Sequence, residues 1–256
     1  MNPVNIKITT ATPKIIMAAA LAKMAFDDTT IQPVINNDFK CDILITFKTL
    51  DFKDYAKSDR KPMLRMASSI TLSIVGLVWK HYGLQILDKL GCISEYQEIV
   101  WRRVDEKYIS VFDSCDSETF ELADCPTPSL DATEDEIISF MEQQICAQIE
   151  LLSSCICEGI LEYGTERYIQ SLIASKGNKP YIELESGTLP WRKKVDEYNR
   201  FNQEGMPIKF VIYPYGKEFV AESVYTHPLQ NGHEEHIMQF ATDKTALIKE
   251  FRRKTK

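Results

Sequence analysis

The stretch VNIKITTATPKIIMAAALAKMAFDDTTIQPVI, residues 4–35, decides the fold of the first part of this chain. Val4–Thr9 is an apolar run typical of a strand, Pro13 can open a helix that extends to about Phe26, and Ile31–Ile35 is a second apolar run. A strand, a helix and a strand in close succession form the βαβ pattern of a parallel sheet.

The turn between the first strand and the helix has the position of an active-site loop. In open α/β sheets, ligands and catalytic groups collect at the carboxyl ends of the strands. Between Ile8 and Met24, however, there is no His, Cys, Asp, Glu, Arg or Gly. This loop is therefore expected to keep the shape of a site without its chemistry.

The remaining sequence predicts a fold of the α/β class with two lobes. The first lobe (domain 1–130) is expected to be a mainly parallel sheet flanked by helices, and the second (176–256) a smaller α+β lobe. Helices at 131–175 are expected to link the two. Thr133 and Glu136 have the spacing of a capping box, and 48–62 is expected to be a long loop. In the first lobe we also expect a strand at 42–47, a helix at 68–91 with Ser68 or Ser69 as its N-cap and Gly91 at its end, and a helix at 94–108. Two further helices are expected at 134–152 and 155–175. The second lobe is expected to hold a strand in 181–185, a helix with Pro190 at its first position, a hairpin at 209–226 and a closing helix in 243–256.

Composition and charge narrow the function classes. The chain has 256 residues, a formal net charge of −7 and seven cysteines. The odd, irregularly spaced cysteines favour a reducing compartment, and no secretory signal or membrane-spanning run is evident, so a cytoplasmic or nuclear location is expected. Residues 105–150 hold 13 acidic residues and one basic residue, Lys107. This block predicts a basic partner and makes the first half a poor nucleic-acid surface.

Isolated candidate ligands have ordinary structural interpretations. His81 lies in an apolar helix, His233 and His236 lie beside a turn glycine without further ligands, and Cys155 and Cys157 diverge on a helix. Asp113 and Asp116, in SVFDSCDSE, could bind a divalent ion, although acids in such positions are more often caps.

Three collinear segments carry a resemblance to a known family. LSIVGLVWKHYG (72–83) resembles the LSSAGLVYKHFG segment of the melanocyte-proliferating-gene family, metal-dependent hydrolases of the DHH phosphoesterase superfamily. IELESGTLPWRKKV (182–195) and FVIYPYGKEFVAESV (210–224) resemble later segments of the same family in the same order. The resemblance implies a DHH-type parallel lobe, a substrate lobe, paired divalent ions and phosphodiesterase or RNA exonuclease activity.

The family's ligand motifs are almost absent at the matching positions. The TH-x-G-x-FH-x-DE loop is replaced by TTATPKIIMAAA, in which Thr10 stands where the family's histidine-bearing segment begins, and Thr46 stands where the family has a strand-ending Asp. The DHH region retains at most Asp59, the acidic segment retains Asp113 and Asp116, and the GF-x-GGH substrate loop is replaced by QFA at 239–241. Losing most ligands of a two-metal site removes the means of activating water.

The resemblance and its losses predict a degenerate, catalytically inactive member that acts as a protein-interaction or assembly factor. The expected partner is a protein or a ribonucleoprotein such as the ribosome, with no cofactor, no metal and no membrane, and a small molecule in the vacant cleft remains open. One alternative is non-catalytic RNA or nucleotide binding through basic residues of the second lobe. These are Arg192, Lys193, Lys194, Arg252, Arg253 and Lys254. The least favoured alternative is a residual metal-dependent hydrolase using Asp59, Asp113 and Asp116.

Overall fold

The computed structural model describes residues 3–9, 12–34, 41–46, 50–52, 72–114, 132–202, 205–228 and 234–254. The chain forms two compact units, 1–160 and 161–256. The α/β class predicted from the sequence is confirmed, with a largely parallel sheet in the first unit and a mixed sheet in the second. The predicted boundaries at 130 and 175 stay predictions.

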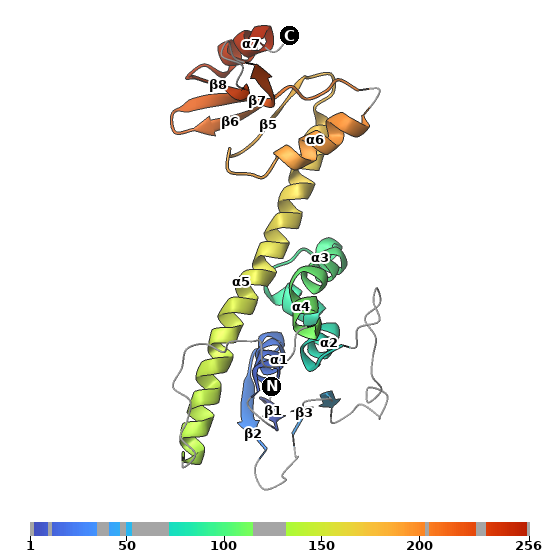
Figure 1. Cartoon of the computed structure of the whole chain (residues 1–256), viewed down its shortest axis with the longest axis vertical. Coiled ribbons are helices and arrows are strands. Elements are labelled where there is room, and N and C mark those ends of the chain that lie inside the picture. Colours follow the sequence, from blue (N-terminus) through green and yellow to red (C-terminus); the bar gives the residue numbers. More distant parts are fainter. Residues whose placement is uncertain are drawn as a thin grey trace. The chain divides into compact units, whose positions relative to one another are not determined.

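The first unit is built on a four-stranded sheet of order β2-β1-β3-β4. β1 pairs in parallel with β2 and β3, as the βαβ pattern predicts, and β4 adds an antiparallel edge within the stretch predicted to be a loop. Helices α1 to α4 accompany this sheet (Figure 1). The elements are β1 (Val4–Ile8), α1 (Pro13–Ala25), β2 (Thr29–Pro33), β3 (Ile43–Ile45), β4 (Leu50–Phe52), α2 (Ile74–Lys89), the 3-10 turn η2 (Ser94–Tyr96), α3 (Gln97–Val104), the π-helical turn η3 (Asp105–Ile109) and α4 (Ser110–Ser114).

The helices of the first unit begin and end where local chemistry allows. Pro13 is at the start of α1, where its missing N–H costs no helical hydrogen bond. The N-cap of α2 is Ser73, whose hydroxyl accepts from Gly76 N, so the prediction of Ser68 or Ser69 is wrong. Gly91 follows this helix with φ +78°, which confirms the predicted stop.

A single helix, α5 (Glu134–Ser175), replaces the two helices predicted at 134–152 and 155–175. Its start is the predicted capping box: Glu136 N donates to Thr133 Oγ1 at 3.4 Å, and Thr133 N donates to Glu136 Oε2 at 2.7 Å. By length and composition α5 is the one helix of the described residues that could cross a membrane, contrary to the expectation of no such run. This is weak evidence, because core helices meet the same test, and a third of the apolar window is buried.

The second unit is a four-stranded sheet of order β5-β6-β7-β8, with helices on both faces (Figure 1). One core packs the end of α5 and α6 against the sheet around Trp191 and Val195. The other packs α7 around Phe210 and Phe251. The elements are β5 (Tyr181–Glu183), α6 (Arg192–Phe201), β6 (Phe210–Tyr215), β7 (Glu218–Pro228), β8 (Glu234–Ala241) and α7 (Lys244–Lys254).

Two local predictions for the second unit need correction. Helix α6 begins at Arg192 with Trp191 as N-cap, so Pro190 precedes the helix and is not its first residue. The stretch containing His236 was expected to be an exposed loop, but His236 lies within strand β8. The packing role predicted for Trp191 is confirmed, because its side chain is 3% exposed in the core.

Candidate functional site

The carboxyl edge of the first sheet presents hydroxyl groups where the resembled family has metal ligands. Thr9 N donates to Ile45 O at 3.2 Å, which holds the end of β1 beside β3. Thr12 comes next in the described chain and precedes α1 without capping it. Its Oγ1 is buried and has no hydrogen-bond partner among the described residues. Thr46 follows β3 at the position of the family's Asp, and Thr10 lies outside the described residues.

Asp113, at the end of α4, caps helix α2. Its Oδ1 accepts a hydrogen bond from Ser73 N at 2.9 Å across 40 residues of sequence. A Cβ on Gly76 would lie 2.6 Å from Oδ1 and 2.8 Å from Oδ2, so any other residue here would require the carboxylate to shift. A negative group is stabilised at this position by the unpaired N–H groups and the dipole of the helix N-terminus. Asp59 and Asp116, the other retained acids, lie outside the described residues.

The described residues at this edge do not fit a pair of divalent ions. Such a centre needs several carboxylates and imidazoles that converge. Within the described ranges, no three His, Cys, Asp or Glu side chains form such a group. Asp113 is held against the N-terminus of α2, and the described residues that follow β1 and β3, Thr9, Thr12 and Thr46, carry no carboxylate or imidazole.

The isolated histidine and cysteine candidates remain separate from this edge. His81 lies in α2, half-buried, with its ring centroid 6.4 Å from that of Tyr82. Cys155 and Cys157 lie on α5, both partly buried, and burial raises the pKa of the Cys155 thiol. The side chain of His236 and all of His233 lie outside the described residues.

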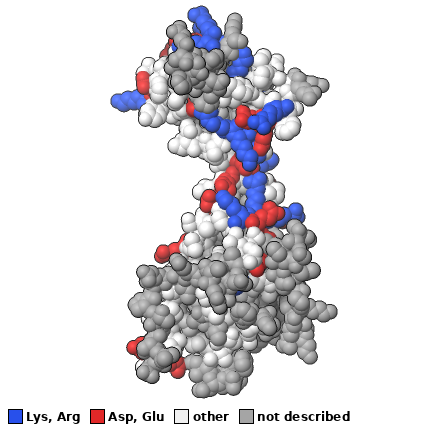
Figure 2. Space-filling model, viewed as in Figure 1, with Lys and Arg blue, Asp and Glu red and all other residues white. Residues whose placement is uncertain are grey.

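The predicted basic residues of α6 are largely engaged in ion pairs. Arg192 pairs with Glu222 of β7 and lies over the ring of Trp191. Glu222 also accepts from Tyr213 Oη at 3.0 Å, and burial together with this carboxylate raises the pKa of Tyr213 to about 12. Lys193 is exposed at the surface. Figure 2 shows Lys and Arg interleaved with Asp and Glu over α6 and the adjoining end of α5.

The basic residues of α7 are dispersed. Arg252 lies over the Tyr181 ring, with its guanidinium carbon 5.3 Å from the centroid. Lys254 donates to Gln239 Oε1 at 3.0 Å and pairs with Glu250. The described geometry therefore does not form a continuous cationic track of the kind that phosphate backbones require.

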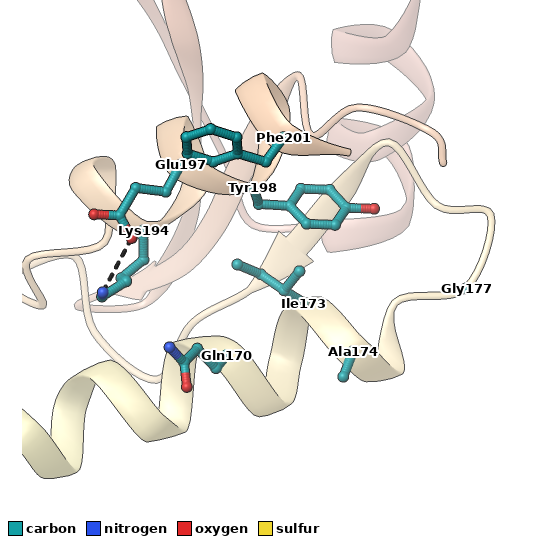
Figure 3. A pocket seen from close by; sticks show the side chains of 8 residues that line it. All are labelled: Gln170, Ile173, Ala174, Gly177, Lys194, Glu197, Tyr198 and Phe201. Carbon is teal, nitrogen blue, oxygen red and sulfur yellow. Dashed lines mark hydrogen bonds and ion pairs between the residues drawn. The ribbon is translucent and has the colours of Figure 1, made fainter. Parts of the chain in front are cut away.

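A groove of about 600 Å³ runs between the end of α5 and α6. Figure 3 shows Ile173 and Tyr198 facing each other across it, with Phe201 at its rim. Phe201 is 82% exposed, which is unusual for a large apolar side chain. The groove is lined by Gln170, Ile173, Ala174, Gly177, Lys194, Glu197, Tyr198 and Phe201.

One end of the groove is charged. Lys194 Nζ lies 3.0 Å from Glu197 Oε2 and 3.4 Å from Glu166 Oε2. The hydrogen bond that Lys194 donates to Glu197, followed by the attraction of Glu166, raises the Lys194 pKa, so this ammonium stays charged. An apolar groove closed by charges suits a protein segment more than a polyanion.

The groove was not predicted from the sequence. Tyr198 and Phe201 are three residues apart, and therefore on one side of α6, which is a detectable signal. The complementary residues on α5 come from a helix that was predicted as two pieces. Only the packed structure brings Ile173 to Tyr198.

Part of the chain is similar to a known protein family. No curated protein matches the chain. A family model, MYG1_exonuc, described as "Uncharacterised protein family (UPF0160)", matches residues 48–142. This span includes α2, whose sequence carries part of the resemblance, and Asp113 that caps it. The match covers less than half of the chain and shows that this part is similar to a family whose name suggests nuclease-like hydrolases.

Proposed function

We propose that the chain is a catalytically inactive member of this nuclease-type family and acts as a protein-interaction or assembly factor. The observation that carries the proposal is the position of Asp113. Its carboxylate is used to cap α2 and is packed against Gly76. A side chain fixed in this way contributes to the fold, and among the described residues it belongs to no group of three or more His, Cys, Asp or Glu side chains that could hold a metal ion.

The groove in the second unit supports the interaction part of the proposal. Phe201 is exposed over most of its surface beside Tyr198 and Ile173. Burying such a side chain against a partner contributes favourable free energy, and clustered exposed apolar residues commonly mark interaction sites. We propose a protein, or the protein surface of a ribonucleoprotein, as the partner, in the cytoplasm or nucleus.

A hydrolysis assay tests the catalytic half of the proposal. The full chain is incubated with short single-stranded RNA and with a chromogenic phosphodiester, each with manganese or magnesium added. We expect no turnover above that of the Asp113→Asn variant. Metal-dependent hydrolysis that Asp113→Asn abolishes would overturn the proposal and restore the residual hydrolase.

A capture experiment tests the interaction half. The tagged chain is used to isolate stoichiometric proteins from native lysate, beside Phe201→Asp and a matched variant, Leu161→Asp. Leu161 is 69% exposed and does not line the groove, so it controls for adding a charge at an exposed apolar position. We expect Phe201→Asp alone to lose the partner. If both variants retain the partner, the groove is not the binding site. Capture that is sensitive to nuclease and weakens steeply with salt would favour the RNA-binding alternative.

A further inference from the structure

Strand β8 leaves one side of its backbone open at the edge of the second sheet. The strand order is β5-β6-β7-β8, so β8 pairs with β7 on one side, and no described strand pairs with its other side. An edge of this kind presents N–H and C=O groups that can pair with another extended segment. The register irregularity between β7 and β8 lies between Glu222 and Thr226, so 238–241 is regular.

The hydrogen bonds of β7 decide which β8 groups face outward. Val224 N donates to Lys209 O at 2.9 Å, which directs alternate residues of β7 toward the strand before it. The residues between them, Ala221 among them, must point toward β8. Ala221 is opposite Gln239, so Gln239 directs its backbone groups inward to β7.

Met238 and Phe240, the neighbours of Gln239, therefore direct their N–H and C=O groups to the outer edge. Their side chains are also exposed, each at 48%. They stand on the sheet face that carries α6, beside a hollow of about 350 Å³ that Tyr215 also lines. The rings of Tyr215 and Phe240 meet edge to face, with centroids 5.9 Å apart. An open backbone edge and an apolar surface thus coincide at two residues.

On the opposite face of the same edge, the charged side chains near Gln239 are Lys254, Arg253 and Glu250, which together carry one excess positive charge. Gln239 Oε1 accepts from Lys254 Nζ at 3.0 Å, and Lys254 also pairs with Glu250 at 3.3 Å. An ammonium has three donors, so these two contacts leave one for a further acceptor. Arg253 is exposed next to Lys254 and adds to the positive potential. A carboxylate placed beside Gln239 would meet this charge.

We propose that the edge of β8 at Met238–Phe240 binds an extended segment of a partner protein as an added strand. Side chains of that strand alternate between the two faces. The segment carries a large apolar side chain beside Met238 and Phe240 and an acidic side chain beside Lys254. Backbone pairing supplies affinity, and the two faces supply specificity. The inference rests on the proposed function, to which it gives a binding surface separate from the groove.

A second copy of the chain fits this edge less well. Pairing two β8 strands about Gln239 would bring two copies of that residue together, each with its own Lys254. Each copy would bring the same excess of positive charge, from Lys254 and Arg253 over Glu250, and like charges disfavour association. A partner with acidic residues removes this cost and uses the same backbone edge.

The test uses the full chain and a short, capped synthetic peptide in which glutamates alternate with valine and phenylalanine. Binding is followed by amide chemical shifts and titration calorimetry. A matched peptide with lysines in place of the glutamates is expected to bind at least about tenfold more weakly. Two further peptides are N-methylated at alternate amides, one set facing β8 and the other facing away. Only the first set is expected to lose binding.

Two protein variants separate backbone from side chain. Met238→Pro removes an outward N–H without touching the ladder to β7, and is expected to weaken binding about tenfold. Met238→Ala keeps the N–H and is expected to weaken it only a few-fold. Equal loss from both methylated peptides, equal binding of the lysine peptide, or no binding at millimolar concentration overturns the inference. So does a dimer of the chain that Met238→Pro dissociates. These outcomes leave the hydrolysis assay unaffected, so the two proposals fail separately.

Discussion

Replacing Gly76 with alanine should destabilise the chain even though alanine is the better helix former. In a helix interior, alanine is favoured over glycine by about 1 kcal/mol. Here the new Cβ would lie 2.6 Å and 2.8 Å from the two oxygens of Asp113, and the carboxylate must move away. Its hydrogen bond to Ser73 N is then lost, at about 2 kcal/mol for a charged acceptor, with about 0.5 kcal/mol more from the helix terminus. The net expectation is a loss of about 1.5 kcal/mol.

The effect of Gly76→Ala on the stability of the chain should change from unfavourable to favourable once the Asp113 carboxylate has been removed. Asp113→Ala alone should cost about 2.5 kcal/mol by removing the cap, since the Ser73 N–H loses its partner and the helix terminus loses its negative charge. In that background Gly76→Ala meets no obstruction from this side chain and should stabilise by about 1 kcal/mol. The coupling between the two sites is therefore about 2.5 kcal/mol. Asp113→Asn, which keeps an acceptor oxygen and loses the charge, should fall between wild type and Asp113→Ala.

Urea unfolding followed by near-ultraviolet circular dichroism is the suitable assay. Trp79 and Trp101 stack at 6.2 Å with their planes 9° apart, which gives a signal local to the first unit. If Gly76→Ala stabilises the wild-type chain, or if the coupling is near zero, Asp113 is not a cap. If the carboxylate were retained for binding a metal, it would not contribute to the stability of the fold, and Asp113→Ala would leave the free energy of unfolding unchanged or raise it.

Two further predictions concern ionisation. Tyr213 should titrate at about pH 12 in an absorbance titration, and Glu222→Gln should lower its pKa while burial keeps it above the ordinary value. Because the folded pKa is raised, the contribution of Tyr213 to stability is complete below about pH 10 and is lost as the pH rises toward 12. Glu136 should have a lowered pKa by carboxyl NMR, because the backbone N–H of Thr133 and then its hydroxyl donate to it, and Thr133→Ala should raise that pKa in part by removing the hydroxyl while the backbone donor remains. The Glu136 contribution is complete above the ordinary carboxyl pKa and is lost as the pH falls through the folded value; an unchanged titration in Thr133→Ala would contradict this cap.

Local signals predicted the first unit well. Pro13 at a helix start, the apolar runs of β1 and β2, and the capping box of Thr133 depend on residues close in sequence. Elements that depend on distant partners were missed. Strand β4 forms only because β3 offers it an antiparallel edge. Strand β8 lacks the alternation of apolar and polar residues that predicts a strand, because both of its faces carry apolar residues.

The continuity of α5 and the role of Asp113 are two further features that the sequence pattern did not specify. Ser153 and Ser154 read as a break between two helices, but neither is a strong helix breaker, and 134–158 contains no glycine or proline. Asp113 was recognised as either a ligand or a cap. Choosing between them required its contact with Ser73, which no pattern along the chain specifies.

Helix α5 also has a consequence for how the chain loses structure. The division between the two units falls at 160, inside a single hydrogen-bonded ladder from Glu134 to Ser175. Interrupting that ladder exposes backbone groups on both sides, as when one repeat of an array unfolds beside its neighbour. Fraying that starts in one unit is therefore transmitted to the other, and hydrogen exchange near residue 160 should report on the stability of both.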